Sequence, residues 1–406
     1  MMSDQVLRAL HDEARDELDN NIIPFWAERA ADREQGGFYG GMNGHGERIP
    51  GADKGLILNA RLLWTFSALH RAGSGSGLKQ LADRAYRILE NCFFDARHGG
   101  AYWMVDYQGN VVDRKKLIYG QAFTIYALAE YEHAGGPDSA GDKAVELFGL
   151  VDEKAHDPRY GGYFEIFERD WKLAGEQRLS EVDMDAGKSM NTHLHLLEAC
   201  TGLQRVRPEA RLHRRLDELL RLFVERIIDP IENRFRLFFD EQWRVLSTLI
   251  SFGHDIEGSW LLCEAAGVHG NDELIGRIRQ IALNMADAVL RYGVDQDGAL
   301  FYEAEPHGIT DTDKHWWPQA EAVVGFLNAY SLNNEPRFLE AAARTWRFIT
   351  ENLVDREGGE WFWSTSREGI ADRSRPKISA WKSAYHNSRA CLEIMARTKA
   401  LLQYKR

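Results

Sequence analysis

Polar side chains interrupt six otherwise apolar helical patterns in this chain of 406 residues, each time near the start of the pattern. Histidine exchanges protons near neutral pH, and arginine holds negative charge. A buried charge without a partner costs several kcal/mol, so this concentration predicts a pocket rather than a core. The interrupting residues are Arg61, Tyr119, Gln121, Asn191, His193, His195, His254, Glu257, Trp316, Trp317, Gln319, Glu321, Trp381, Tyr385, His386, Asn387 and Arg389.

Helical spacing sorts the histidines. His254 and Glu257 are three residues apart, so they share a helix face and the carboxylate can orient or charge the imidazole. His193 and His195 are two residues apart and point about 200° away from each other, so only one of them faces the pocket. His195 lies four residues after Asn191 and shares its face, and we therefore choose His195.

A metal site is the main alternative use of these groups. His195 with Glu198, and His254 with Glu257, both read His-x-x-Glu. Carboxylate di-iron bundles use the reverse order, Glu-x-x-His, with two further glutamates. Glu198 is also expected about 60° away from His195 around its helix. We predict neither a metal nor a cofactor, because no phosphate-binding loop or nucleophile motif is present either.

A cluster of glycines and aromatic residues recurs along the chain and indicates how the helices are arranged. Its copies are GGFYG at 36–40, GGAYW at 99–103, GGYFE at 161–165, a degenerate NRFRLFF at 233–239, DGALFY at 297–302 and GGEWFW at 358–363. The period is about 62 residues, which gives six units. Each cluster predicts a short strand or hairpin, and the intervening segments show the apolar period of helices.

Six helix pairs predict an all-α (α/α)6 barrel of about twelve helices, with short β-hairpins at the repeat turns. We expect one catalytic domain over 1–406, with inner helices that begin near 56, 117, 187, 248, 315 and 379. An open helical solenoid is the alternative. Closure is favoured because the single terminal helices, at about 4–30 and 379–402, can pair with each other.

Composition narrows the class of protein. The net charge is −12 and no basic run offsets it, so nucleic acid is not expected as a partner. No apolar leader or stretch of about 18 uncharged apolar residues occurs, so we expect neither a signal peptide nor a membrane span. Four dispersed cysteines in apolar helical stretches predict buried, reduced thiols in a cytoplasmic protein: Cys92, Cys200, Cys263 and Cys391.

At these motifs the chain resembles the N-acylglucosamine 2-epimerase superfamily, and within it the cellobiose 2-epimerases. The resemblance implies an (α/α)6 barrel and an isomerase of carbohydrates that uses no cofactor. It runs over nearly the whole chain, from residue 22 to residue 394. Its segments are IIPFW (22–26), GGFYG, ADKGLILNARLLWTF (52–66), YGQAF (119–123), KSMNTHLHLLEA (188–199), SFGHDIEGSWLL (251–262), WWPQAEAVVGF (316–326) and AWKSAYHNSRACLEI (380–394).

The resemblance also implies residue roles. His254 and His386 match the acid/base pair, and His195 matches a third essential histidine. Arg61 matches an arginine that contacts substrate oxygens, and Glu257 a carboxylate beside the first catalytic histidine. Asp183 matches a sugar-binding acid, with Asp185 as its rival in the loosely similar segment EVDMDAG. The other substrate-pocket positions are Tyr119, Asn191, Trp260, Trp317, Glu321 and Trp381.

The implied reaction interconverts the reducing-end glucose and mannose of β-1,4-linked disaccharides such as cellobiose and lactose. The ring opens, one histidine removes the C2 proton to give a cis-enediolate, and the other returns a proton to the opposite face. Tandem Trp316 and Trp317, together with Trp381, are able to stack two sugar rings.

Four other functions remain open. Reprotonation at C1 would make the chain a mannose isomerase. A monosaccharide, mannose or N-acylglucosamine, is an alternative substrate for the epimerase. A glycoside hydrolase would need two carboxylates roughly 5–10 Å apart across the barrel axis, and Glu257 and Glu321 are the candidates. A non-enzymatic carbohydrate-binding protein would leave the three histidines without a role.

Overall fold

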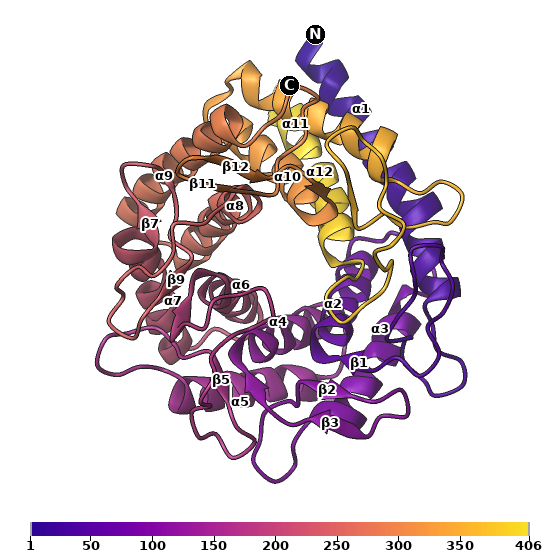
Figure 1. Cartoon of the computed structure of the whole chain (residues 1–406), viewed down its shortest axis with the longest axis vertical. Coiled ribbons are helices and arrows are strands. Elements are labelled where there is room, and N and C mark those ends of the chain that lie inside the picture. The colour runs from indigo at the N-terminus through magenta and orange to yellow at the C-terminus, as the bar shows by residue number, and fades with distance from the viewer. Residues whose placement is uncertain (1, 405–406) are drawn as a thin grey trace.

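Twelve α-helices form a closed ring of two layers in the computed structural model, which describes residues 2–404 (Figure 1). The predicted (α/α)6 barrel is therefore confirmed. Residue 1 and residues 405–406 of the expected domain lie outside the described residues. The inner helices are α2 (Leu56–Arg71), α4 (Ile118–His133), α6 (Met190–Val206), α8 (Phe252–His269), α10 (Trp316–Asn333) and α12 (Tyr385–Tyr404). The outer helices are α1 (Met2–Glu17), α3 (Leu78–Ile88), α5 (Asp138–Lys154), α7 (Ala210–Leu222), α9 (Asp272–Tyr292) and α11 (Pro336–Phe348).

The two layers differ in how their sequences are patterned. Every residue of α2 from Leu56 to Leu69 is buried, because an inner helix is covered on all sides. In α3 the buried residues are Leu78, Ala82, Ala85 and Tyr86, the single apolar stripe of a helix with one face in water. One boundary was predicted wrongly. α12 begins at residue 385 and not at 379, so Trp381 lies in the irregular segment before the helix.

Several outer helices end in a wider π-helical turn before the chain returns toward the barrel mouth. These turns follow α1, α3, α7 and α11 directly or after a short break. Their bounds are Leu18–Ile22, Phe25–Arg29, Leu89–Phe93, Phe223–Ile227 and Ile349–Leu353. Each is followed by one of the glycine-aromatic clusters.

All six glycine-aromatic clusters, including the degenerate copy, form the predicted hairpins. The first and last residues of each hairpin pair across an antiparallel bridge. The pairs are Ala31 with Phe38, Phe94 with Ala101, His156 with Tyr163, Ile228 with Phe235, Val294 with Leu300 and Val354 with Trp361. The degenerate copy keeps its fold without glycine, and Asn233 there takes the left-handed backbone conformation (φ 53°).

A second set of short strands links each unit to the next. The strand before an inner helix pairs antiparallel with the strand that follows the next hairpin, as β1 (Lys54–Gly55) does with β2 (Met104–Val105). The same link joins β4 (Lys116–Leu117) to β5 (Ile166–Phe167), β6 (Lys188–Ser189) to β9 (Phe238–Phe239), β10 (Ile250–Ser251) to β11 (Glu303–Glu305), and β13 (Lys314–His315) to β14 (Ser364–Thr365).

The ring closes through the same kind of contact. Met42 of the first unit pairs with Ile378 of the last, and α1 packs against α12. The remaining strands belong to single hairpins: β3 (Val111–Asp113), β7 (Ile228–Asp229), β8 (Arg234–Phe235) and β12 (Gly308–Asp311). Closure rules out the open solenoid.

A buried lysine-aspartate pair holds five of the six units together. In each, an aspartate at the start of the hairpin accepts a bond from a lysine that comes shortly before the inner helix. The pairs are Lys54–Asp32 (2.9 Å), Lys116–Asp95 (3.3 Å), Lys188–Asp157 (2.7 Å), Lys314–Asp295 (3.1 Å) and Lys377–Asp355 (2.6 Å). These charges tie the outer hairpin to the inner helix that bears the polar residues.

Two expectations from composition can be compared with the structure. No helix among the described residues is both long and apolar enough to cross a membrane. All four cysteines are free, as predicted, but only Cys200 and Cys391 are fully buried; Cys92 and Cys263 are partly exposed.

We expect Lys188→Met to lower the free energy of unfolding by about 3 kcal/mol, because it leaves the Asp157 carboxylate buried without its cation. Urea unfolding followed by circular dichroism measures the change. Lys172→Met is the matched control, since Lys172 is 82% exposed and its ion pair with Asp170 lies in water. Equal stability of the two variants would contradict a structural role for the buried pair.

Candidate active site

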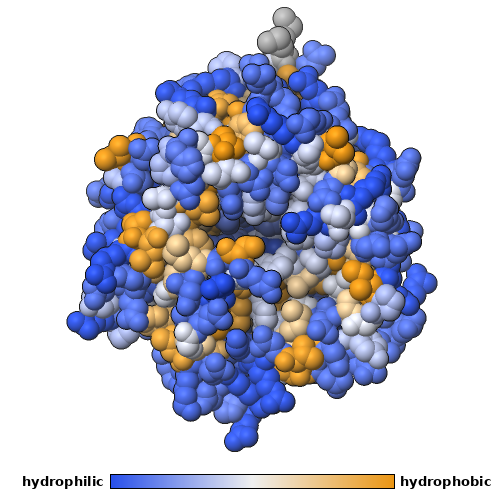
Figure 2. Space-filling view, in the orientation of Figure 1, coloured by the Kyte–Doolittle hydropathy of each residue, from blue (hydrophilic) through white to orange (hydrophobic). Residues whose placement is uncertain are grey.

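Three histidines from three inner helices approach the barrel axis, where Figure 2 shows a hollow at the centre of the molecular face. They are His195 of α6, His254 of α8 and His386 of α12. The ring of Trp317 lies 4.7 Å from that of His254 and 5.7 Å from that of His386. Two of the histidines chosen from the sequence therefore share one aromatic neighbour, whereas the ring of His195 lies against Tyr119 and Phe123.

Two of the histidines are held by buried carboxylates. Nδ1 of His386 lies 2.7 Å from Glu321 Oε1, and Nδ1 of His195 lies 2.9 Å from Glu198 Oε2. An ionised carboxylate only accepts hydrogen bonds, so it places the ring proton on Nδ1. Nε2 of both rings is then left with a lone pair, as a proton acceptor requires.

His254 has a different partner, and this corrects one prediction. Its Nδ1 lies 2.7 Å from Ser251 Oγ, three residues earlier at the start of α8. Glu257, which we expected to orient His254, instead accepts a bond from Arg389 at 2.5 Å. A hydroxyl can donate or accept, so Ser251 allows either tautomer of His254.

Burial makes the two candidate acid/base histidines weakly basic. It lowers the pKa of His254 to about 3, with further lowering by His195 and His386. Burial also lowers the pKa of His386 to about 3, although the bond with Glu321 opposes it. Both rings are therefore neutral at pH 7, and their mutual influence agrees with a position around one cavity.

Arg61 brings a positive charge to this cavity without a carboxylate partner. It is 4% exposed; its Nη2 donates to Tyr119 Oη at 2.9 Å and its Nη1 to the carbonyl of Trp381 at 3.0 Å. Within residues 2–404 it forms no ion pair, and its buried Nε has no hydrogen-bond partner. Its guanidinium lies 4.4 Å over the ring of Phe123. Such a cation is prepared for an anionic ligand.

Arg389, by contrast, is paired with carboxylates through both of its Nη atoms, although its buried Nε has no hydrogen-bond partner among the described residues. It lies 2% exposed behind the histidines, and donates to Glu321 at 2.7 Å, to Glu257 and to Glu198. The hydroxyl of Tyr385 donates to Glu198 Oε1 at 2.5 Å. Sequence reasoning noted Arg389 and Tyr385 as out of place but gave them no role, and it set Glu198 aside.

The aromatic side chains at the hollow come in pairs that the sequence did not reveal. Trp317 and Trp381, which we expect to contact the substrate, are half-buried. Each has an aromatic neighbour from a hairpin: Tyr302 lies 6.4 Å from Trp317, and Trp103 lies 5.6 Å from Trp381. Both neighbours belong to the glycine-aromatic clusters, and their place in that repeat was the available signal.

Two predicted polar contacts also lie near the mouth. Asn191 is half-buried, and its Oδ1 has no hydrogen-bond partner although that atom is inaccessible to water. Asp183 is half-buried, and burial raises its pKa. The negative charge of Asp183 contributes to the raised pKa of Tyr119 and of Tyr302, so Asp183 lies on the cavity side. Its rival Asp185 is exposed and accepts a bond from the backbone of Gln177 at 2.8 Å.

Three predicted pocket residues lie behind the cavity wall instead. Trp260 is 3% exposed, and its Nε1 donates to Glu321 Oε2 at 3.0 Å. His386 and Arg389 occupy the other oxygen of Glu321. Neither Trp260 nor Glu321 therefore has a polar atom free to bind a substrate. Trp316 is 4% exposed and packs on Trp363, 4.7 Å between rings, and its ring lies 6.5 Å from that of His386. Trp317 is the more exposed member of the tandem and lies closer to the histidines.

His193 faces away from the cavity, as helical geometry predicted. Its Nε2 accepts a bond from the backbone of Tyr163 at 2.9 Å, which anchors α6 to its hairpin. Other inner helices use their fourth residue in the same way: Gln121 to Ala101, Asp255 to Phe235 and Gln319 to Leu300. A Cβ on Gly162 (φ 75°) would lie 2.6 Å from His193 Nε2, so this contact also requires glycine.

The polar cluster offers one group of potential metal ligands, which we tested for fit. Glu257, Glu321 and His386 place ligand atoms within 4.8 Å of one another. The guanidinium of Arg389 already lies against both carboxylates, so a cation would compete with an existing one. The same geometry disfavours a hydrolase pair: Glu257 and Glu321 share one nitrogen of Arg389 and do not face each other across the axis.

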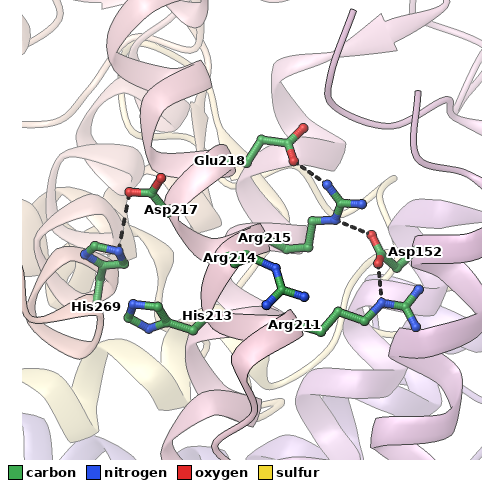
Figure 3. A pocket seen from close by; sticks show the side chains of 8 residues that line it. All are labelled: Asp152, Arg211, His213, Arg214, Arg215, Asp217, Glu218 and His269. Atoms are coloured by element: carbon green, nitrogen blue, oxygen red, sulfur yellow. Dashed lines mark hydrogen bonds and ion pairs between the residues drawn. The ribbon is translucent and has the colours of Figure 1, made fainter. Parts of the chain in front are cut away.

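A separate surface pocket of about 680 Å³ lies on the outer layer, around α7 (Figure 3). Figure 3 shows Arg215 between Glu218 and Asp152, and Asp152 also bonded to Arg211. Its charged groups are thus largely paired with one another. None of the predicted catalytic residues lines it.

The family model of N-acylglucosamine 2-epimerase (GlcNAc 2-epimerase) matches residues 37–390. Cellobiose 2-epimerase of Bacteroides fragilis is 43% identical, over 95% of this chain and 98% of that protein. Cellobiose 2-epimerase of Dictyoglomus turgidum is 38% identical, over 96% and 99%.

A solved structure agrees. The structure of cellobiose 2-epimerase from Bacillus thermoamylovorans B4167 superposes with a TM-score of 0.92 at 40% identity, and the match covers 96% of this chain and all of that one. The chain therefore belongs to the N-acylglucosamine 2-epimerase family and is a carbohydrate epimerase, an isomerase.

Proposed function

We propose that the protein interconverts the reducing-end glucose and mannose of β-1,4-linked disaccharides such as cellobiose and lactose, and that the whole chain acts as one catalytic domain. The observation that carries the proposal is the convergence of His195, His254 and His386 beside Arg61, a buried cation without an ion pair. The relatives named cellobiose 2-epimerase support the choice of substrate.

The C2 proton of an aldose is acidic only when C1 is a carbonyl, so the reaction starts with ring opening. Proton transfer to the ring oxygen and from the anomeric hydroxyl opens the ring, and a histidine is suited to both steps. His386 then takes the C2 proton on Nε2, because Glu321 holds the proton of that ring on Nδ1. We propose that His195 stabilises the open-chain sugar. Glu198 holds the ring proton of His195 on Nδ1, which is the same tautomer as in His386.

Deprotonation creates a cis-enediolate with negative charge shared between O1 and O2. Arg61 is the group that stabilises this charge, since its guanidinium is buried and carries no carboxylate. A cation already paired, like Arg389, would contribute less because three carboxylates offset its charge. Tyr119 holds Arg61 in place at 2.9 Å.

Reprotonation on the opposite face completes the epimerisation. His254 supplies that proton from Nε2, in a tautomer that its hydroxyl partner Ser251 permits because the hydroxyl can donate to Nδ1. Before the next turnover His386 releases the proton that it took and His254 regains one, both by exchange with solvent. In the reverse direction the two histidines exchange roles. Trp317, between their rings, and Trp381 provide the flat apolar faces on which sugar rings stack.

Incubation with cellobiose, lactose, mannose and N-acetylglucosamine in D2O tests the reaction itself. We expect a mannose-ended product from cellobiose with deuterium at C2, because the proton passes through a histidine that exchanges with solvent. NMR of the products measures both. A fructose-ended product would assign an isomerase, release of glucose a hydrolase, and turnover of the monosaccharides alone a monosaccharide epimerase; no turnover would favour a binding protein.

His254→Ala and His386→Ala should each lower kcat by at least about 100-fold, because each removes one of the two proton-transfer groups. Initial rates on cellobiose, with circular dichroism to check folding, measure the effect. His213→Ala is the control, since His213 lies on the outer layer in the pocket of Figure 3. Near-normal activity of both site variants would overturn the assignment.

A further inference from the structure

One guanidinium joins three inner helices behind the histidines. Arg389 of α12 donates from Nη2 to Glu257 Oε1 of α8 at 2.5 Å and to Glu321 Oε1 of α10 at 2.7 Å. Its Nη1 bonds Glu198 of α6 and the hydroxyl of Tyr385. The side chains of these four charged residues are 1–3% exposed, so water does not share in their pairing.

Two of the three carboxylates also touch a histidine, Glu198 through its second oxygen and Glu321 through the oxygen that Arg389 bonds. Glu198 holds Nδ1 of His195 and Glu321 holds Nδ1 of His386. Arg389 therefore lies one carboxylate behind two histidines that come from different helices. His254, held by Ser251, is outside this arrangement.

The three carboxyl groups that Arg389 contacts differ in the direction in which their pKa values are shifted. Burial would raise the pKa of Glu198, but attraction to Arg389 overcomes it and lowers that pKa to about 2. The same opposition lowers the pKa of Glu321. Burial, and then repulsion by Glu321, raises the pKa of Glu257. Attraction to Arg389 thus lowers the pKa of the two carboxylates that hold histidines.

Other helices place charged or titratable groups near the cluster, but those groups do not bond the carboxylates of Glu198, Glu257 and Glu321. α2 contributes Arg61, which donates to Tyr119 and a backbone carbonyl. α4 contributes the phenols of Tyr119 and Tyr126, and α8 the neutral His254. The buried Glu17 of α1 bonds Asn21 and Trp361 instead. Within the described chain, Arg389 is the one arginine or lysine bonded to Glu198 or Glu321.

We propose that Arg389 is a positioning residue that sets the tautomers of His195 and His386 together, by keeping both of their partner carboxylates ionised. The proposal rests on the proposed function, in which Nε2 of His386 accepts the C2 proton. Without this cation a buried glutamate takes up a proton and donates it to Nδ1, and the ring proton then resides on Nε2. A ring in that tautomer is no longer a base toward the cavity.

Arg389→Met tests the proposal through the pH dependence of kcat/KM on cellobiose. Loss of the positive charge raises the pKa of Glu198 and Glu321, so the acidic limb should move up by about one pH unit. We expect kcat at a pH on that limb to fall by up to about 10-fold, with little change in KM, because Arg389 does not face the cavity. Arg389→Lys keeps the charge and should restore the position of the acidic limb.

The matched control is Arg397→Met. Arg397 lies on the same helix, bonds Glu393 at 2.9 Å and, like Arg389, lies over the ring of Trp260. It should leave kcat, KM and the acidic limb unchanged. An acidic limb that stays in place in Arg389→Met, or a lysine variant no better than the methionine variant, would overturn the proposal, since a purely structural role moves stability alone.

Nitrogen-15 NMR of histidine-labelled, unliganded protein separates this proposal from the proposed function. Wild-type His195 and His386 should both carry their proton on Nδ1, with assignments taken from His195→Asn and His386→Asn. A proton on Nε2 of either ring would refute the proposal even if no variant folds. Failure of the wild type to epimerise any sugar would refute the function and leave this tautomer result standing.

Discussion

The walls of the proposed active site are joined by a single buried cation. Arg389 is the point at which α6, α8 and α10 are tied to α12, and each tie is a carboxylate that would be intolerable in that location alone. A hydrophobic cluster would pack the same four helices without directional bonds. The ion cluster instead specifies how each helix is rotated about its axis, and so which side chains it turns toward the cavity.

Two arginines that both lie over the ring of Tyr385 have opposite electrostatic roles. Arg389 is surrounded by hydrogen-bond acceptors, and its positive charge is paired with carboxylates in the walls of the cavity. Arg61 is held by a phenol and a carbonyl, both neutral, so its charge is available to a ligand. The site combines a rigid anionic layer at its back with a cationic lining at its front, an arrangement suited to an intermediate that is negative only briefly.

Much of this was readable from the sequence, and the limits have a physical basis. The repeat of the glycine-aromatic turns predicted the ring, and helical geometry distinguished His195 from His193. Residue spacing within one helix did not predict the hydrogen-bond partner of a side chain that residues from several helices can reach. Glu198 and Glu257 both follow a histidine by three residues, yet the former bonds its histidine and the latter bonds Arg389. The outcome is decided by a residue about 130 positions or more away, which no local pattern contains.

Closure of the ring through Met42 and Ile378 has a consequence for how the chain reaches its folded state. The two residues are more than 300 positions apart, but loop-closure entropy grows only with the logarithm of length. Joining them costs about 1.5 kcal/mol more than joining the ends of a single unit. During synthesis the first unit cannot pair with the last unit until the last unit has left the ribosome. The ion cluster behind the proposed active site, which needs Arg389 from that last unit, is therefore assembled only after residue 389 has been synthesised.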